Sequence, residues 1–156
     1  MKRIILLIAI VLMVCHSAYA ESINLKSYQQ GDWASLLSSA KGSPMAIHFW
    51  GVTCAPCAKE MPQWGKFVAA NKNANLIFIQ VDDVSPEMIQ QMLTKANLGQ
   101  AKNYYVNFAF DEQLRHEIDP KWRGETPITI LIDQNGKATR KTGPMNFSQL
   151  QSWFRS

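Results

Sequence analysis

The chain has 156 residues, of which 16 are Lys or Arg and 12 are Asp or Glu, and 47% of the chain is hydrophobic. This length suits a single domain, since domains typically run to about 100–200 residues. The small positive balance and the lack of basic runs with interleaved aromatic residues argue against nucleic-acid binding, so we expect no nucleic-acid partner.

The first 20 residues have the features of a secretory signal peptide. Residues 1–3 form a basic head, residues 4–14 an unbroken apolar run, and residues 18–20 a small-x-small cleavage site. The apolar run has 11 residues, well short of the ~20 that a membrane-spanning helix needs. We therefore predict that 1–20 is removed, that the protein is exported to the periplasm, and that 21–156 forms one domain.

Two other interpretations of the N-terminal segment stay open. The first is an uncleaved N-terminal anchor, which differs from a signal peptide mainly in whether a peptidase acts. The second is a lipoprotein signal that uses Cys15, although Val14 stands where such signals usually carry a small residue. Cleavage would leave 14 Lys and Arg against 12 Asp and Glu, and Cys54 and Cys57 as the only cysteines.

Helices and strands are expected to alternate along the rest of the chain. Hydrophobic runs rich in β-branched and aromatic residues indicate the strands, and turn residues separate the elements. The expected helices cover 33–37, 54–71, 85–98, 112–118 and 147–154. The expected strands cover 45–50, 75–81, 104–110, 127–133 and 137–142. This order predicts an α/β fold in which a mixed sheet has helices on both faces.

Local signals support several element ends. Asp111 and Asn146 are expected N-caps, and the pair Asn135-Gly136 is typical of a tight hairpin turn. Pro62 lies inside the helix expected over 54–71 and predicts a kink there. Residues 121–123 lie between the helix expected over 112–118 and the strand expected over 127–133, and they are interpreted as a solvated loop.

The segment FWGVTCAPCAKEMP, residues 49–62, holds Cys54 and Cys57 two residues apart. A disulfide there closes too short a loop to stabilise the fold much, and a zinc site needs four ligands. The histidines of the mature chain, His48 and His116, lack ligand spacing. We expect no metal and no cofactor, with a copper carrier that uses the two thiolates as the remaining binding alternative.

A redox couple has a physical basis in this segment. Cys54 follows a strand and begins a helix, so unpaired backbone N–H groups lower the pKa of its thiol from ~8.5 toward or below neutrality. Cys57 lies one turn further in, and Pro56 stiffens the dipeptide between the two sulfurs. We therefore expect Cys54 to be the nucleophile and Cys57 the resolving thiol.

The segment resembles the active-site motif of the exported TlpA/ResA-like thiol–disulfide oxidoreductases, FW-x-x-W-C-x-P-C-x-x-E-x-P. The likeness continues through GETPITILIDQNGKATRKTG, residues 124–143, and covers nearly all of 44–154. It implies a thioredoxin fold. The long stretch over 81–127 is similar to the TlpA type, which implies an extra helix–strand insertion before the strand that follows the cis-proline.

The resemblance assigns roles residue by residue. It implies that Cys54 and Cys57 form the redox disulfide and that Pro127 is a cis-proline facing them. It also implies that the Thr126 backbone binds a substrate strand. Glu60 matches a catalytic glutamate near the thiols, and its i, i+3 spacing from Cys57 agrees, although a solvated helix residue is the plainer interpretation.

The chain departs from the family pattern at two positions. Thr53 stands where a tryptophan is common, which changes the rim that partners touch. His48 stands where related proteins carry aspartate or asparagine, and it is a candidate for a proton relay with Glu60 or else a satisfied core histidine. Trp50 and Thr53 are counted among the substrate-binding residues, although packing beside the site is the simpler role for Trp50.

The resulting expectation is a periplasmic reductant of protein disulfides, for example in cytochrome c maturation. Such a reductant would need a membrane electron donor of the DsbD or CcdA type. The motif needs no second chain, so we expect a monomer. Three alternatives stay open: a disulfide oxidant or isomerase, the copper carrier, and an inert substrate-binding module.

Overall fold

The computed structural model describes residues 23–40 and 42–155, so the predicted signal peptide, with Cys15, lies outside the described residues. Within the part of the chain that is described, no helix is long and apolar enough to cross a membrane.

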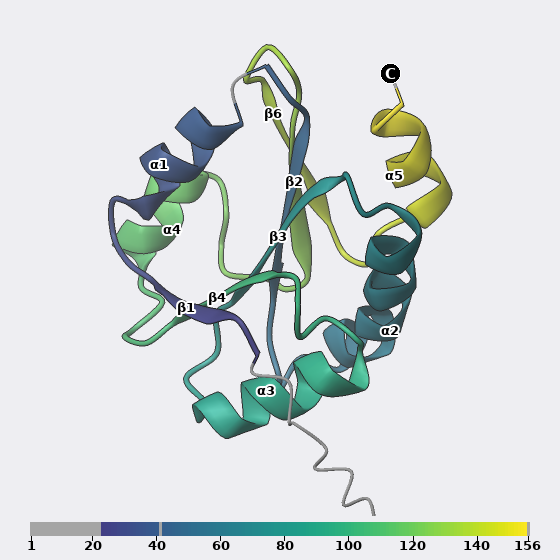
Figure 1. The fold of residues 1–156 in the computed structure, drawn as a ribbon. Coiled ribbons are helices and arrows are strands. Elements are labelled where there is room, and N and C mark those ends of the chain that lie inside the picture. Colours follow the sequence, from purple (N-terminus) through teal and green to yellow (C-terminus); the bar gives the residue numbers. More distant parts are fainter. Residues whose placement is uncertain (1–22, 41, 156) are drawn as a thin grey trace, which may run out of the picture.

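A six-stranded mixed sheet forms the centre of the molecule, in the order β1-β4-β3-β2-β5-β6 (Figure 1). The strands are β1 (Leu25–Tyr28), β2 (Met45–Trp50), β3 (Asn75–Gln80), β4 (Lys102–Val106), β5 (Ile128–Ile132) and β6 (Ala138–Thr142). The helices are α1 (Asp32–Ser39), α2 (Ala55–Ala70), α3 (Pro86–Lys95), α4 (Glu112–Ile118) and α5 (Phe147–Trp153). The first four strands in the sheet order run parallel, and β5 and β6 are antiparallel to their neighbours.

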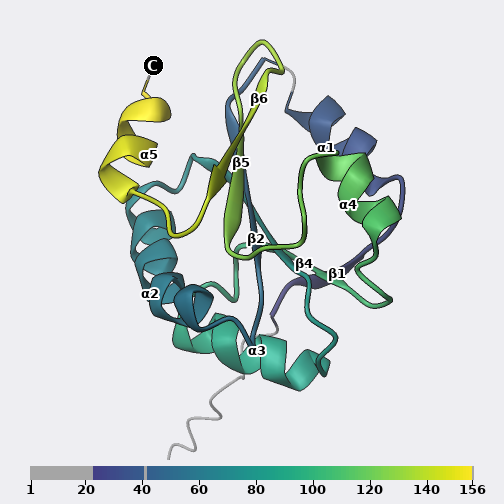
Figure 2. The same cartoon turned by 180° about the vertical axis from the view of Figure 1, so that it is seen from behind.

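Helices cover both faces of the sheet, with α1 and α4 on one face and α2, α3 and α5 on the other (Figures 1 and 2). Alternate residues of β2 enter the two cores, because successive strand side chains point to opposite faces. Phe49 packs on the α1/α4 side with Trp33 and Trp122. Trp50 packs on the α2 side in the same apolar cluster as Cys57.

The site lies at the end of β2, a central strand whose six residues are all buried. The chain leaves β2 through residues 51–53 and enters α2. Because β5 runs antiparallel to β2, with Phe49 opposite Ile128, the loop before β5 reaches the same end of the sheet. The pairing therefore brings two loops, far apart in sequence, to one edge.

The structure confirms the α/β class and the five expected helices and five expected strands, with bounds shifted by a few residues. Asp111 and Asn146 are confirmed as N-caps, since their carboxylate and amide oxygens accept bonds from Leu114 N–H and Gln149 N–H. The turn at Asn135-Gly136 is also confirmed, with Gly136 at a φ of 82°. The extra helix–strand unit consists of α3 and β4, and β4 lies between β3 and β1.

Three details differ from the sequence expectation. β1 was not predicted, because it is four residues long and forms through distant parallel pairing with β4. The strand expected over 104–110 instead spans Lys102–Val106, since its partners on both sides end there. Trp122 is only 3% exposed, so residues 121–123 are not a solvated loop throughout. Its ring packs between Phe49 and Phe110.

Candidate active site

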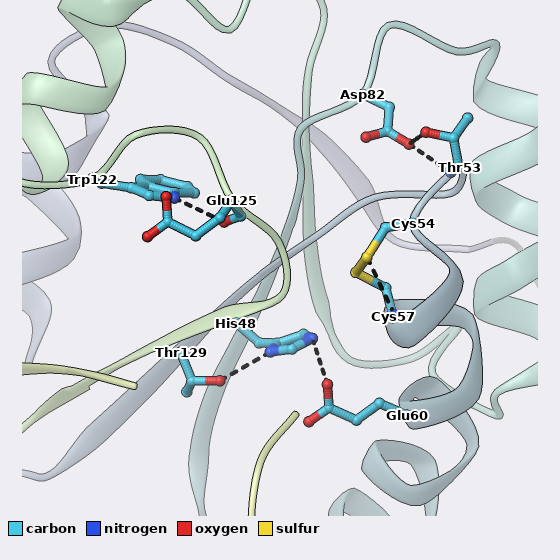
Figure 3. The surroundings of a disulfide bond; sticks show 9 residues. All are labelled: His48, Thr53, Cys54, Cys57, Glu60, Asp82, Trp122, Glu125 and Thr129. Carbon is cyan, nitrogen blue, oxygen red and sulfur yellow. Dashed lines mark hydrogen bonds and ion pairs between the residues drawn. A yellow bond between two sulfur atoms is a disulfide. The ribbon is translucent and has the colours of Figure 1, made fainter. Parts of the chain in front are cut away.

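The two cysteines form a disulfide at the N-terminus of α2 (Figure 3). Cys54 is the N-cap residue, and its sulfur accepts a hydrogen bond from Cys57 N–H at 3.2 Å. Cys57 is fully buried and Cys54 is partly exposed. Only the Cys54 side of the disulfide is therefore open to an external thiol or disulfide.

The loop before β5 reaches the same edge of the sheet as the disulfide and contains a cis peptide bond between Thr126 and Pro127, as the family resemblance implies. The indole N–H of Trp122 donates to the Glu125 carbonyl at 2.9 Å and so fixes the loop next to the cis bond (Figure 3). Thr126 is half-buried and Pro127 is buried. No local sequence pattern indicates that Trp122 supports this loop.

His48 and Glu60 lie together in the core below the disulfide (Figure 3). Both side chains are almost inaccessible, at 1% and 3% exposed, and His48 Nε2 is 3.9 Å from Glu60 Oε2. His48 Nδ1 is 3.0 Å from the Thr129 hydroxyl, and Glu60 Oε1 accepts a bond from Met145 N–H at 2.6 Å. Glu60 is therefore not a solvated helix residue but a carboxylate held inside the protein.

Burial dominates the ionisation of both groups. Desolvation lowers the pKa of His48 to about 3, so this ring is neutral at physiological pH. Desolvation raises the pKa of Glu60, and the hydrogen bond from the Met145 N–H and the nearby Trp64 indole oppose that rise without cancelling it. The core beside Cys57 thus holds a neutral imidazole and a carboxyl group with an elevated proton affinity.

A second carboxylate contacts the loop in front of the cysteines. Asp82, two residues after β3, accepts bonds at Oδ2 from the Thr53 N–H at 2.7 Å and from the Thr53 hydroxyl at 2.9 Å (Figure 3). A Cβ on Gly51 would contact the same carboxylate, so no larger residue fits there without displacing it. Asp82 cannot be linked to the site from the sequence, because 29 residues separate it from Thr53.

The remaining residues singled out from the sequence lie at different depths. Trp50 is 1% exposed and lies beneath the site, so it does not reach the protein surface. Thr53 is exposed at the rim. Within residues 23–40 and 42–155, no group of three or more His, Cys, Asp or Glu side chains could hold a metal ion.

Known proteins with similar sequences are thiol–disulfide oxidoreductases. No family model matches the chain. Sporulation thiol-disulfide oxidoreductase A of Bacillus subtilis is 30% identical over 118 residues, which are 72% of this chain and 67% of that protein. Thiol-disulfide oxidoreductase ResA of the same organism is 30% identical over 121 residues, 76% of this chain and 63% of ResA. The aligned part thus spans about two thirds of these relatives or slightly less.

Solved structures show the same fold. StoA from Bacillus subtilis aligns with a TM-score of 0.56 and 24% identity over 72% of this chain and 83% of that one. A secreted Mycobacterium tuberculosis disulfide oxidoreductase homologous to Escherichia coli DsbE aligns with a TM-score of 0.59 and 22% identity, covering 76% of this chain and 84% of that one. The fold and the CxxC disulfide define a thioredoxin-like redox protein.

The chain belongs to the ResA/StoA/DsbE-like family of thioredoxin-fold thiol–disulfide oxidoreductases. Its activity is accordingly that of a thiol–disulfide oxidoreductase with Cys54–Cys57 as the CxxC disulfide.

Replacing His48 by Asn should weaken the acid sensitivity of the fold. The unfolded chain binds a proton on His48 below about pH 6.5, whereas the folded protein does so only near pH 3, so stability falls as pH drops between these values. Glu60, with its raised pKa, acts in the opposite direction and is retained in the variant. Between pH 6.5 and 4, H48N should lose about 3 kcal/mol less of its free energy of unfolding than the wild type.

Urea denaturation of both proteins between pH 6.5 and 4 measures how the free energy of unfolding depends on pH. His116→Asn is the matched control, because His116 is exposed on α4 and its replacement should leave the wild-type pH slope unchanged. Equal pH slopes for H48N and the wild type would contradict the buried, neutral state of His48.

Proposed function

We propose that this protein is an exported reductant of disulfides in other proteins. The observation that carries the proposal is the buried carboxyl group of Glu60, one helical turn beyond Cys57 and beside a neutral His48. Within the described part of the chain, no Lys or Arg forms an ion pair with Glu60.

Electron flow depends on how well the fold stabilises the reduced cysteines. A strong oxidant of this class stabilises its reduced form, whereas a reductant does not. A carboxylate close to Cys57 disfavours a thiolate there by like-charge repulsion. The dipeptide Ala55-Pro56 between the cysteines carries no charge that would compensate. These features favour the disulfide form, so electrons tend to leave the protein.

The proposed reaction has two exchange steps. The Cys54 thiolate attacks one sulfur of a substrate disulfide, a Cys54–substrate disulfide forms, and the other substrate sulfur leaves as a thiolate. Cys57 then loses its proton and attacks Cys54 Sγ, which releases the second substrate sulfur. The protein ends as the Cys54–Cys57 disulfide, and the substrate has gained two electrons.

Glu60 is the proposed acceptor of the Cys57 proton. Its raised pKa keeps its proton affinity closer to that of a thiol than an exposed carboxylate would have, which suits proton transfer. His48 Nε2 lies 3.9 Å from Glu60 Oε2, which is too long for a direct hydrogen bond in this state. Because the two side chains are neighbours, we assign His48 a positioning and relay role beside Glu60. Thr129 fixes the ring from the other side.

The proposed substrate surface is the rim around Cys54. Thr126 and Pro127 lie on the loop before β5, which reaches the same edge of the sheet as Cys54, and Thr53 is exposed beside Cys54. An extended substrate segment bound along the Thr126 backbone would present its disulfide to Cys54. Trp50 supports this rim from below through packing rather than by contact with substrate.

The proposed electron donor and substrates are those that a reductant outside the cytoplasm requires. One similar solved protein is described as secreted, which supports export of this chain, either as a cleaved protein or with a retained anchor. A reductant outside the cytoplasm needs resupply of electrons, so we propose a membrane donor of the DsbD or CcdA type. Exported proteins with disulfides, including oxidised apocytochrome c, are the proposed substrates of a monomeric enzyme.

The reduction potential of the Cys54–Cys57 couple tests the direction. Equilibration with glutathione at pH 7, followed by alkylation and mass spectrometry, should give a value near the ~−270 mV of thioredoxin. A value near ~−120 mV would identify an oxidant and overturn the proposal.

Glu60→Gln is the matched variant for this measurement. It keeps an oxygen to accept the Met145 N–H bond but removes the charge. Its potential should be less negative than that of the wild type, by about 30 mV for each tenfold gain in the stability of the reduced form. An unchanged reduction potential would show that the charge of Glu60 does not set the reducing strength of the cysteines.

Trapping of mixed disulfides tests the assigned roles of the cysteines. Cys57→Ala expressed in the native periplasm should accumulate partner proteins bound to Cys54, because no thiol remains to release them. Cys54→Ala is the matched control and should trap none, since Cys57 is buried. Failure of Cys57→Ala to trap any partner would favour an inert binding module, and tight stoichiometric Cu(I) binding by the reduced protein without reductase activity would favour a copper carrier.

A further inference from the structure

Asp82 has no role in the exchange steps described above, yet its carboxylate contacts the residue immediately before Cys54. Two hydrogen bonds end on one oxygen, Oδ2, and both come from Thr53: the N–H at 2.7 Å and the hydroxyl at 2.9 Å. The Thr53 peptide nitrogen is separated from Cys54 by a single residue step. The Asp82 carboxylate is therefore held against the residue that precedes Cys54 (Figure 3).

The position of this carboxylate is well determined. Val81 N–H donates to the Trp50 carbonyl, which continues the β2–β3 pairing up to the residue before Asp82. The Asp82 carbonyl accepts bonds from the Gln80 side chain at 3.0 Å and from Val84 N–H at 3.1 Å. The side chain then occupies the space above Gly51, where a Cβ would contact it. The strand end and the turn thus aim Asp82 at the loop over 51–53.

The charge of Asp82 acts on the Cys54 side of the site, opposite to Glu60. Reduced Cys54 lies at the N-terminus of α2, whose backbone N–H groups stabilise a thiolate. A carboxylate close to a thiolate opposes that stabilisation by like-charge repulsion. The other titratable residues drawn around the disulfide in Figure 3 are His48 and Glu60 in the core and Glu125 on the loop before β5.

We propose that Asp82 is a positioning residue that fixes the loop before Cys54 through Thr53 and sets the reducing strength of the site by destabilising the Cys54 thiolate. The inference rests on the proposed function. The N-terminus of α2 favours the reduced protein, and the Asp82 carboxylate would oppose this effect, as a reductant requires. Asp82 touches neither sulfur nor substrate. Its contribution is to the redox equilibrium and to the order of the rim.

Asp82→Asn tests the charge while retaining an oxygen for Thr53. The thiolate fraction of Cys54 below its pKa should rise about threefold, which lowers the pKa of that thiol by about half a unit. The measurement is the pH dependence of Cys54 alkylation by iodoacetamide in the fully reduced protein. At pH 8 the equilibrium with glutathione should shift about threefold toward the reduced protein, which corresponds to about 15 mV.

Three further variants separate charge from geometry. Asp83→Asn is the matched control, because Asp83 is the adjacent exposed acid and its loss changes the net charge equally. It should leave the Cys54 thiol and the potential as in the wild type. Thr53→Val removes the hydroxyl bond to Asp82 but keeps the backbone bond, so the pKa of the Cys54 thiol and the glutathione equilibrium should stay near those of the wild type. Asp82→Ser removes the charge with a smaller acceptor and replaces Asp82→Asn if the amide does not fold.

The outcomes distinguish this proposal from the proposed function. An unchanged Cys54 pKa and glutathione equilibrium in Asp82→Asn, or an equal shift in Asp83→Asn, overturns the role of Asp82 and leaves the wild-type potential as the test of reductant function. A wild-type potential in the oxidant range overturns the reductant, while a shift confined to the Asp82 variants still supports the role of Asp82.

Discussion

The hydrogen bond from Met145 N–H to Glu60 Oε1, 2.6 Å long, ties the loop before α5 to the helix that carries the disulfide. It lets a carboxylate remain in the core, where an unpaired polar group would be costly. His48 and Thr129 extend the same polar network across β2 and β5. The site therefore depends on a polar contact inside the apolar layer between α2 and the sheet, to which the loop before α5 and strand β5 both contribute.

This network gives the disulfide an asymmetric environment. One sulfur faces the open rim, with the cis-proline loop opposite, and the other faces a core that disfavours negative charge. Asp82 adds a carboxylate at the rim, so the helix N-terminus that would stabilise the Cys54 thiolate is balanced on that side as well. The proposed reducing strength thus comes from the destabilised thiolate form and not from the disulfide itself.

Elements with local signals could be predicted from the sequence. Strand β2 is a continuous apolar run, and α4 and α5 begin at side chains that cap them. The cysteine pair and the cis peptide before Pro127 were recognised from a motif. Features made by distant pairing could not be predicted: β1 exists because β4 aligns with it, and Asp82 meets Thr53 because β3 lies beside β2. The burial of Glu60 next to His48 likewise depends on how α2 packs on the sheet.

The most direct test of this account compares the stability of the oxidised and the reduced protein by urea denaturation at pH 8. A fold that disfavours thiolates should have a larger free energy of unfolding with the disulfide intact than with the cysteines reduced. If the reduced protein proves equally or more stable, its surroundings stabilise the thiolates. That result would contradict the central claim.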